Sequence, residues 1–325
     1  ETVRALTEHN IDSRFACLVS DDLHPDTLIH EGHMDHIIHR AIEEGLNPIT
    51  AIQMATINTA ECFGLARDLG SVSPGKWADI VLLDDLTKVH VKMTLINGEV
   101  VAENGALCIE IPAHSYPSFA KNTMNVGKTL QASDFQICVP EDFSDDTITA
   151  HIIGINEALA GTNHLTGTLT VTDGKVESDL NNDYLKLVVI DRHTASTRMG
   201  KGFVHGFGLK SGAVASTVAH DAHNLSVLGT NDADMALAAN TLIAVGGGMV
   251  VVQDGKVLAL NPLPIAGLMS EDPASEVAMR TAQIDEAWKI LECSIVSPFM
   301  TMALLSLAVI PELRLTNKGL VNTIT

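Results

Sequence analysis

A run of five apolar residues near the start of the chain ends directly in acidic side chains. Residues 15–19 (Phe-Ala-Cys-Leu-Val) predict a strand that is covered on both faces. Ser20 follows, then Asp21 and Asp22, with His24 two residues further on. A strand of this kind is typical of a parallel β/α protein, in which chemistry gathers at the C-terminal ends of the strands. Asp21 and Asp22 are therefore candidate catalytic residues or metal ligands, and a helix N-cap or an acidic turn is the structural alternative.

Helical patterns flank this strand on both sides. We expect helices over residues 1–10, 26–45 and 49–63, where Gly45 ends the second helix and Pro48 opens the third. A helix–strand–helix order is typical of the end of a β/α barrel or of an open α/β sheet. A complete barrel takes about 250 residues, so a barrel interpretation leaves room here for roughly one β/α unit.

The pattern changes beyond this unit to short strands and then to a mixture of strands and helices. Asn97-Gly98 predicts a hairpin turn between strands at 89–96 and 99–102, after a strand at 78–83. In the second half, expected strands cover residues 165–177, 184–191, 213–219, 225–228, 249–253 and 257–260, and expected helices cover 232–245 and 276–291. We therefore divide this α/β chain into a barrel end (1–66), a small β-sandwich domain (67–112), a linker (113–129) and a C-terminal α/β domain (130–325).

Histidines occur in two groups that suit metal or substrate binding. His30, His33, His36 and His39 recur at steps of three, so neighbours lie close on a helix but all four cannot reach one ion. A partly exposed polar face is the commoner explanation of such a run.

The second group is the segment His220-Asp221-Ala222-His223-Asn224, which lies between two apolar strands. On an extended segment Asp221 and His223 point the same way, which favours a shared site, and a polar turn is the alternative. Arg192-His193 follows a buried strand and is ambiguous. Gly246-Gly247-Gly248 follows a helix and precedes a strand, which is the reverse of a dinucleotide fingerprint.

Charge and cysteine content restrict the partners. The chain has 40 acidic and 20 basic residues and a net charge of −20, so we expect no nucleic acid or acidic membrane as partner. Five cysteines without a CxxC pair indicate free thiols in a reducing compartment, and we expect a cytoplasmic protein. The apolar run at 298–311 is too short and too interrupted for a membrane span, so we expect no membrane association. A large apolar C-terminal domain favours a homo-oligomer.

Several segments together resemble the bacterial adenine deaminase family of the amidohydrolase superfamily. The resemblance covers nearly the whole chain, and the first two of its segments are the most specific in the first half. The segments are residues 19–25 (Val-Ser-Asp-Asp-Leu-His-Pro), 31–35 (Glu-Gly-His-Met-Asp), 54–58 (Met-Ala-Thr-Ile-Asn), 73–80 (Ser-Pro-Gly-Lys-Trp-Ala-Asp-Ile), 206–213 (Gly-Phe-Gly-Leu-Lys-Ser-Gly-Ala), 220–224, 262–270 (Pro-Leu-Pro-Ile-Ala-Gly-Leu-Met-Ser) and 309–313 (Val-Ile-Pro-Glu-Leu).

The resemblance implies a metal-dependent (β/α)8 barrel, of which this chain holds the last β/α unit. It also implies hydrolysis of adenine to hypoxanthine and ammonia with a divalent metal, manganese or iron. It implies that Asp21 ligates the metal, takes a proton from the attacking water and passes it to the leaving amino group, with Asp22 as the adjacent alternative. His24, Glu31 and His33 lie in its specific segments and are candidate substrate or secondary-site residues. His220, Asp221 and His223 are candidates to face the purine or a secondary metal.

The sequence also departs from the family pattern. The early His-x-His pair of the family and its middle ligands have no counterpart here, and residues 194–200 replace a segment expected to be rich in glycine. We therefore expect a portion of a longer protein that is inactive as an isolated chain. Two alternatives stay open, namely another cyclic amidohydrolase and a non-catalytic structural fragment.

Overall fold

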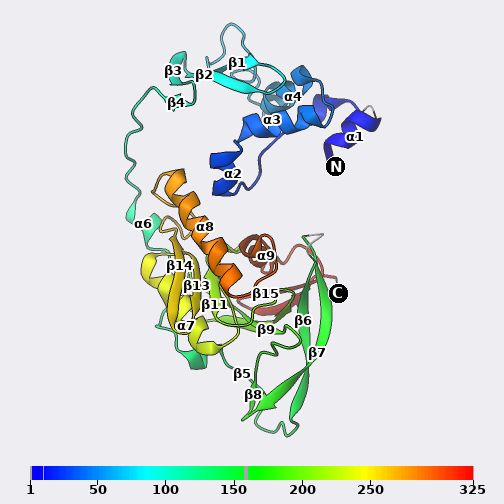
Figure 1. The fold of residues 1–325 in the computed structure, drawn as a ribbon, viewed down its shortest axis with the longest axis vertical. Helices are drawn as coiled ribbons and strands as arrows, with labels where there is room; N and C mark the ends of the chain where they lie inside the picture. The colour runs from blue at the N-terminus through cyan, green and yellow to red at the C-terminus, as the bar shows by residue number, and fades with distance from the viewer. Residues whose placement is uncertain (1, 10, 157–159, 325) are drawn as a thin grey trace. The chain divides into compact units, whose positions relative to one another are not determined.

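The chain forms two compact units, Glu1–His114 and Ser115–Thr325. The computed structural model describes residues 2–9, 11–156 and 160–324, and Figure 1 shows their helices and strands in chain order. The predicted helix over 1–10 is α1 (Thr2–His9), with residues 1 and 10 outside the described ranges.

The predicted buried strand at 15–19 is wrong for this structure. A short 3-10 helix, η1 (Ser13–Phe15), precedes an irregular segment, in which the side chains of Phe15 and Val19 are 88% and 61% exposed. Leu18 donates its backbone N–H to Met54 O at 3.1 Å instead of joining a sheet. A strand of this kind is stabilised by neighbouring strands, and none pairs with this segment among the described residues of the first unit.

The two long helices predicted after this segment are each divided. Residues 26–45 form α2 (Pro25–His30) and α3 (Met34–Glu43), separated by Gly32 with φ +123°. Residues 49–63 form α4 (Pro48–Ala55) and α5 (Ile57–Cys62), which meet at Thr56. The sequence analysis predicted neither break.

One antiparallel sheet closes the first unit where the sequence predicted a small sandwich. Its strands β1 (Ile80–Asp85), β2 (His90–Ile96), β3 (Glu99–Glu103) and β4 (Ala106–Leu107) follow one another in space in chain order. Asn97 and Gly98 both have positive φ (51° and 83°), as the predicted hairpin turn requires. The short last strand was not predicted.

The second unit is built on a ten-stranded mixed sheet with the strand order β14-β13-β11-β12-β9-β10-β6-β7-β8-β5. The strands are β5 (Ile137–Cys138), β6 (Thr147–Ile155), β7 (Thr162–Thr172), β8 (Lys175–Val176), β9 (Leu185–Ile190), β10 (Met199–His205), β11 (Ala213–Ser216), β12 (Leu225–Gly229), β13 (Gly248–Gln253) and β14 (Lys256–Pro262). The remaining elements are α6 (Ser118–Lys121), η2 (Ala132–Phe135), α7 (Asp232–Val245), α8 (Ala274–Ile290), α9 (Pro298–Leu304) and a separate hairpin of β15 (Leu313–Thr316) and β16 (Gly319–Asn322).

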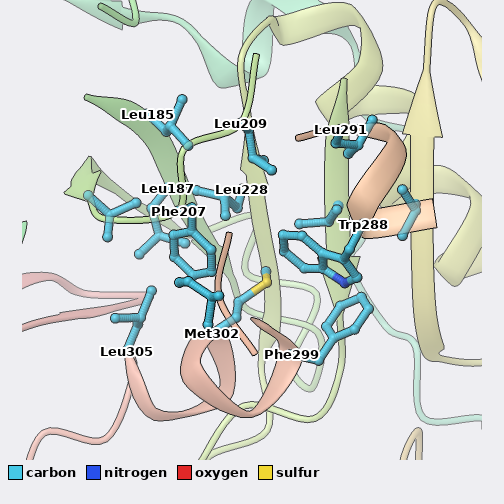
Figure 2. Packing of buried hydrophobic residues seen from close by; sticks show 14 of the residues in the cluster. Leu185, Leu187, Phe207, Leu209, Leu228, Trp288, Leu291, Phe299, Met302 and Leu305 are labelled. Carbon is cyan, nitrogen blue, oxygen red and sulfur yellow. The ribbon is translucent and has the colours of Figure 1, made fainter. Parts of the chain in front are cut away.

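Two hydrophobic clusters lie on opposite faces of β9 and explain its largely apolar sequence, in which Lys186 is the one charged residue. Leu187 and Val189 belong to the cluster that includes α8 and α9, whereas Val188 and Ile190 belong to the cluster that includes α7. Successive side chains of a strand point to opposite faces, so all six residues of β9 are buried. In the first cluster the Trp288 ring stacks on Phe207 (centroids 5.9 Å apart) and meets Phe299 edge to face (5.0 Å) (Figure 2).

The predicted strands and helices between residues 165 and 291 are present. Strands β6 and β10, helix α9 and the last hairpin were not predicted. Most of residues 113–129, expected to be a linker, belong to the second unit, where Val126 is buried and Asn125 donates its N–H to Arg192 O at 2.7 Å.

Candidate functional site

The acidic pair at 21–22 lies on the surface of the first unit, just before α2. Asp21 and Asp22 are both exposed, and Asp21 has φ +49°, a left-handed conformation that is uncommon for residues other than glycine. His24, also on this segment, occupies the N-cap position of α2 with an extended backbone. The structure therefore leaves these side chains together on one short, accessible segment.

Glu31 and His33 lie at the break between α2 and α3. The Glu31 carboxylate pairs with His36 Nε2 at 3.4 Å, and the backbone N–H of His33 donates to Asp35 Oδ1 at 2.8 Å. Two other histidines of the run also pair with acids four residues away, His30 with Asp26 (3.5 Å) and His39 with Glu43 (3.3 Å). These contacts agree with a polar helix face, the commoner explanation of the run.

The side chains of the described residues do not form a metal site by themselves. No group of three or more histidine, cysteine, aspartate or glutamate side chains among them is arranged to hold an ion. Asp21 and Asp22 alone do not make up a ligand set for the divalent metal implied by the sequence, since metal sites in proteins use about four or more ligands. The described residues on their own therefore do not fit such a metal.

A buried arginine, Arg192, connects several segments of the second unit by hydrogen bonds. Arg192 follows β9 and is 1% exposed, yet its guanidinium donates to backbone oxygens from three segments that are distant in sequence. Its donors reach His223 O (Nε, 2.5 Å), Thr123 O (Nη1, 3.2 Å) and Ala266 O (Nη2, 2.9 Å), and Nη1 also bonds Thr123 Oγ1. Burial lowers the pKa of Arg192 to about 10, so the side chain stays charged at neutral pH.

The carboxylate of Asp191 holds the loop that follows Arg192 by hydrogen bonds. It accepts the N–H groups of His193 (2.9 Å) and Thr194 (3.3 Å) and the hydroxyls of Thr194 and Ser196. Burial opposes ionisation, but these four hydrogen bonds prevail and hold the pKa of Asp191 well below its usual range. The segment 194–200, where we expected glycine, is thus tied through Thr194 and Ser196 to a buried carboxylate.

The segment 220–224 forms a turn, so the predicted extended conformation, with Asp221 and His223 on one side, is wrong. The backbone N–H of His223 donates to Ala219 O at 2.7 Å, and His223 has φ +47°. His220 and His223 are half-buried with ring centroids 5.2 Å apart, while Asp221 is exposed. A segment that turns back on itself satisfies its own backbone, the alternative that the sequence left open.

One hydrogen bond to the His223 ring defines the tautomer of its neutral form. The backbone N–H of Ala219 donates to His223 Nδ1 at 3.2 Å, so the neutral ring carries its proton on Nε2. Burial, His220 and Arg192 lower the pKa of His223, which keeps this ring neutral at physiological pH. His193 Nε2 lies 2.8 Å from Ala222 O and ties the Asp191 loop to the turn.

The glycine triplet 246–248 packs against Gly267, which in turn lies against Arg192. Thr217 Oγ1 accepts the N–H of Gly248 (2.8 Å) and bonds Gly267 O (2.6 Å). A side chain at Gly247 would lie 2.6 Å from the Cα of Gly267, and one at Gly267 would lie 2.9 Å from the guanidinium of Arg192. The sequence pattern left Arg192 ambiguous and did not reveal its role, for which an arginine two residues after a largely apolar strand was the available signal.

Models of known protein families match both halves of the chain. The model of the adenine deaminase C-terminal domain matches residues 160–325, and that of the amidohydrolase family matches residues 6–101. No helix in the described part of the chain is long and apolar enough to cross a membrane.

The similar curated proteins are named adenine deaminases. An adenine deaminase of Moorella thermoacetica is 54% identical over 323 residues, which are 99% of this chain and 54% of the relative. One from Clostridium botulinum is 55% identical over 322 residues (99% and 53%), and adenine deaminase 3 of Rhizobium meliloti is 44% identical over 321 residues (98% and 53%). The chain thus spans about half the length of these relatives.

Among solved structures, an amidohydrolase from Thermotoga maritima is 26% identical over 22% of this chain and 19% of its own, with a TM-score of 0.20. That likeness is too slight to carry an argument. The C-terminal domain model, in contrast, matches just over half of the chain. The chain therefore belongs to the adenine deaminase family.

Proposed function

We propose that the protein containing this chain hydrolyses adenine to hypoxanthine and ammonia. The observation that carries this proposal is the match to adenine deaminases, which runs at 54% identity through both units over 99% of the chain. A match to the amidohydrolase model alone would suit many substrates. The match to the adenine deaminase C-terminal domain supports adenine as the substrate.

In the longer protein, residues 15–19 would form the last strand of the (β/α)8 barrel. The outward-facing Phe15 and Val19 support this, because such exposed apolar side chains are costly unless a neighbour covers them. The amidohydrolase match across residues 6–101 also supports it. Asp21 would then lie at the C-terminal end of a barrel strand, where barrel enzymes carry their chemistry.

The proposed reaction adds water at the amino-bearing carbon of adenine and expels ammonia. Asp21 would accept a proton from the attacking water and return it to the leaving amino group, so that one water is consumed and one ammonia released. Asp22 is the adjacent alternative, and His24, Glu31 and His33 are proposed to lie near the substrate. The family is metal-dependent, and we propose manganese or iron, which Asp21 or Asp22 would hold together with ligands from the half of the relatives that this chain does not match.

The experiment compares Asp21→Asn with Asp22→Asn in the longer protein and measures ammonia release from adenine. We expect Asp21→Asn to lower kcat by at least about a hundredfold, the typical contribution of one general acid–base group, and Asp22→Asn to change it much less. The two variants discriminate between the neighbouring carboxylates, because both side chains are exposed on the same segment. Unchanged release by Asp21→Asn would remove this residue from the reaction.

A further inference from the structure

Two histidines of the second unit face each other across neighbouring strands of the large sheet. His151 lies on β6 and His164 on β7, whereas the residues of the proposed reaction belong to the first unit. His164 Nε2 lies 2.8 Å from His151 Nδ1, and the centroids of the two rings are 4.8 Å apart. Imidazole nitrogens are the commonest metal ligands of proteins, so two that face each other are a candidate metal site.

The pairing of the two strands places both rings on one face of the sheet. β6 and β7 run antiparallel (Figure 1), with His151 opposite Thr166 and His164 opposite Ile153. Side chains two residues apart on a strand share a face, so His164 points to the same side as Thr166 and His151. The two histidines are therefore diagonal neighbours, which long side chains can connect.

The backbone next to this pair is fixed, while the two side chains are accessible. The backbone N–H of His164 donates to Glu312 Oε2 at 2.7 Å, and Thr162 Oγ1 donates to Leu313 O at 2.8 Å. These bonds hold the start of β7 against residues 312–313. His151 and His164 are both exposed, so an ion from solution can reach their rings. A rigid backbone that presents accessible ligands is what a binding site requires.

We propose that His151 and His164 bind a divalent transition metal ion of the nickel(II) or copper(II) class. The two facing nitrogens are the protein ligands, and water completes the coordination. In the hydrogen-bonded pair, one of these nitrogens carries a proton. On metal binding that neutral ring takes its proton on its other nitrogen, so both facing nitrogens offer lone pairs and no net proton is released.

The separation of the two nitrogens indicates the class of metal. Bonds from a metal to imidazole are about 2.0 Å long, so two ligands at a right angle lie about 2.8 Å apart and two at the tetrahedral angle about 3.3 Å apart. The observed 2.8 Å agrees with the right angle. Square or tetragonal sites with nitrogen ligands are typical of copper(II) and nickel(II), whereas zinc(II) sites are tetrahedral. Rotation of the exposed rings about their Cβ–Cγ bonds would direct both lone pairs to one ion.

The ligand type distinguishes this site from the metal of the proposed reaction. Imidazole suits nickel and copper, whereas manganese favours carboxylate and water oxygens. In the described part of the chain, no further histidine, cysteine, aspartate or glutamate joins this pair to make a group of three ligands. The net charge of −20 favours cations in general. We therefore expect a site that is completed by water and prefers nickel(II) to manganese(II).

The experiment titrates the 325-residue chain, without an affinity tag, with nickel(II) in a calorimeter. The variants are His151→Asn, His164→Asn, both together, and His205→Asn as the control. His205 belongs to the same unit and its side chain is 44% exposed, but its Nδ1 lies near Asn182 O (3.2 Å) and Asp183 (3.7 Å) and not near a second histidine ring nitrogen. Nickel(II) is the probe because thiols can reduce copper(II).

We expect each single substitution to weaken nickel binding at one site at least about tenfold, since even residues that only orient a metal ligand contribute that much. Because the two rings hold one ion, the double variant should bind no more weakly than either single variant. His205→Asn should keep the wild-type affinity. Nickel(II) should also raise the urea midpoint of the wild type more than that of either single variant, because an ion that binds the folded site stabilises it.

The inference fails if either single variant binds nickel(II) as the wild type does, which would leave the pair as a hydrogen bond between two strands. Losses that add in the double variant would indicate two independent rings and would also overturn it. An equal loss in His205→Asn, or tighter binding of manganese(II) than of nickel(II) by the pair, would contradict the proposed ligands or the metal class. Adenine takes no part in these measurements, so their outcome is independent of the proposed reaction.

Discussion

Replacing Asp191 with asparagine tests whether its carboxylate stabilises the loop that follows β9 in the large sheet. The carboxylate accepts two backbone N–H groups and two hydroxyls. Asparagine keeps one oxygen for the N–H groups but loses the charge and the second oxygen. Since hydrogen bonds to a charged group contribute about 1.5–3 kcal/mol each, and new bonds from the amide offset part of the loss, we expect the free energy of unfolding to fall by about 2–4 kcal/mol near pH 7.

The pH dependence of this effect has a definite sign. The pKa of Asp191 is lower in the folded protein than the value of about 3.9 expected for an unfolded chain. Its contribution is therefore complete above the unfolded pKa and is lost as the pH falls toward the folded pKa. From this linkage, the difference between wild type and variant should shrink by about 1.3 kcal/mol between pH 7 and pH 3.

The assay is urea unfolding followed by the fluorescence of Trp288. The only other tryptophan, Trp77, is 62% exposed in the first unit, so Trp77→Phe makes the signal specific to the second unit. Asp173→Asn is the control, because Asp173 is exposed at a hairpin tip with φ +50°, which asparagine tolerates. A loss below about 0.5 kcal/mol, or a difference that does not shrink with acidity, would refute this role of the Asp191 carboxylate.

Two further predictions concern residues next to Arg192. Gly267→Ala should destabilise the second unit by at least about 1 kcal/mol more than Gly255→Ala in urea unfolding. Both glycines have φ +72°, but only at Gly267 would the added methyl meet a guanidinium, that of Arg192, at 2.9 Å, and equal losses of stability would contradict this crowding. The folded-state pKa of His223 is lowered, so its neutral form favours folding above an unfolded pKa of about 6.5, and this stability is lost as the pH falls through that value. His223→Gln should flatten the dependence between pH 7 and pH 5 in the same assay, and an unchanged slope would contradict the lowered pKa.

The sequence predicted the second unit better than the first for a physical reason. β9 buries both faces within this chain, so its largely apolar sequence at 185–190 and its structure agree. Residues 15–19 are all apolar, but no strand pairs with them in the described part of the first unit, and Phe15 stays exposed. Apolar sequence predicts burial, whereas strand pairing depends on partners that a local pattern does not contain.

Local sequence patterns singled out candidate site residues by type but did not give their arrangement. The pattern at 220–224 pointed to a polar site, and the structure forms a turn because Arg192, His193 and Ala219 supply its hydrogen bonds from outside the segment or across it. Such long-range bonds leave no trace in local periodicity. Thr123 and Ala266, which bond Arg192, carry no sequence signal of their own.

The reaction can be followed atom by atom in the longer protein. Incubation with adenine in water labelled with oxygen-18 should give one ammonia for each hypoxanthine, and the hypoxanthine should carry one labelled oxygen, because hydrolytic deamination takes that oxygen from water. A panel of other purines and cyclic amides should react far more slowly. Unchanged adenine together with opening of a cyclic amide would contradict adenine deamination and make the protein an amidohydrolase of another substrate.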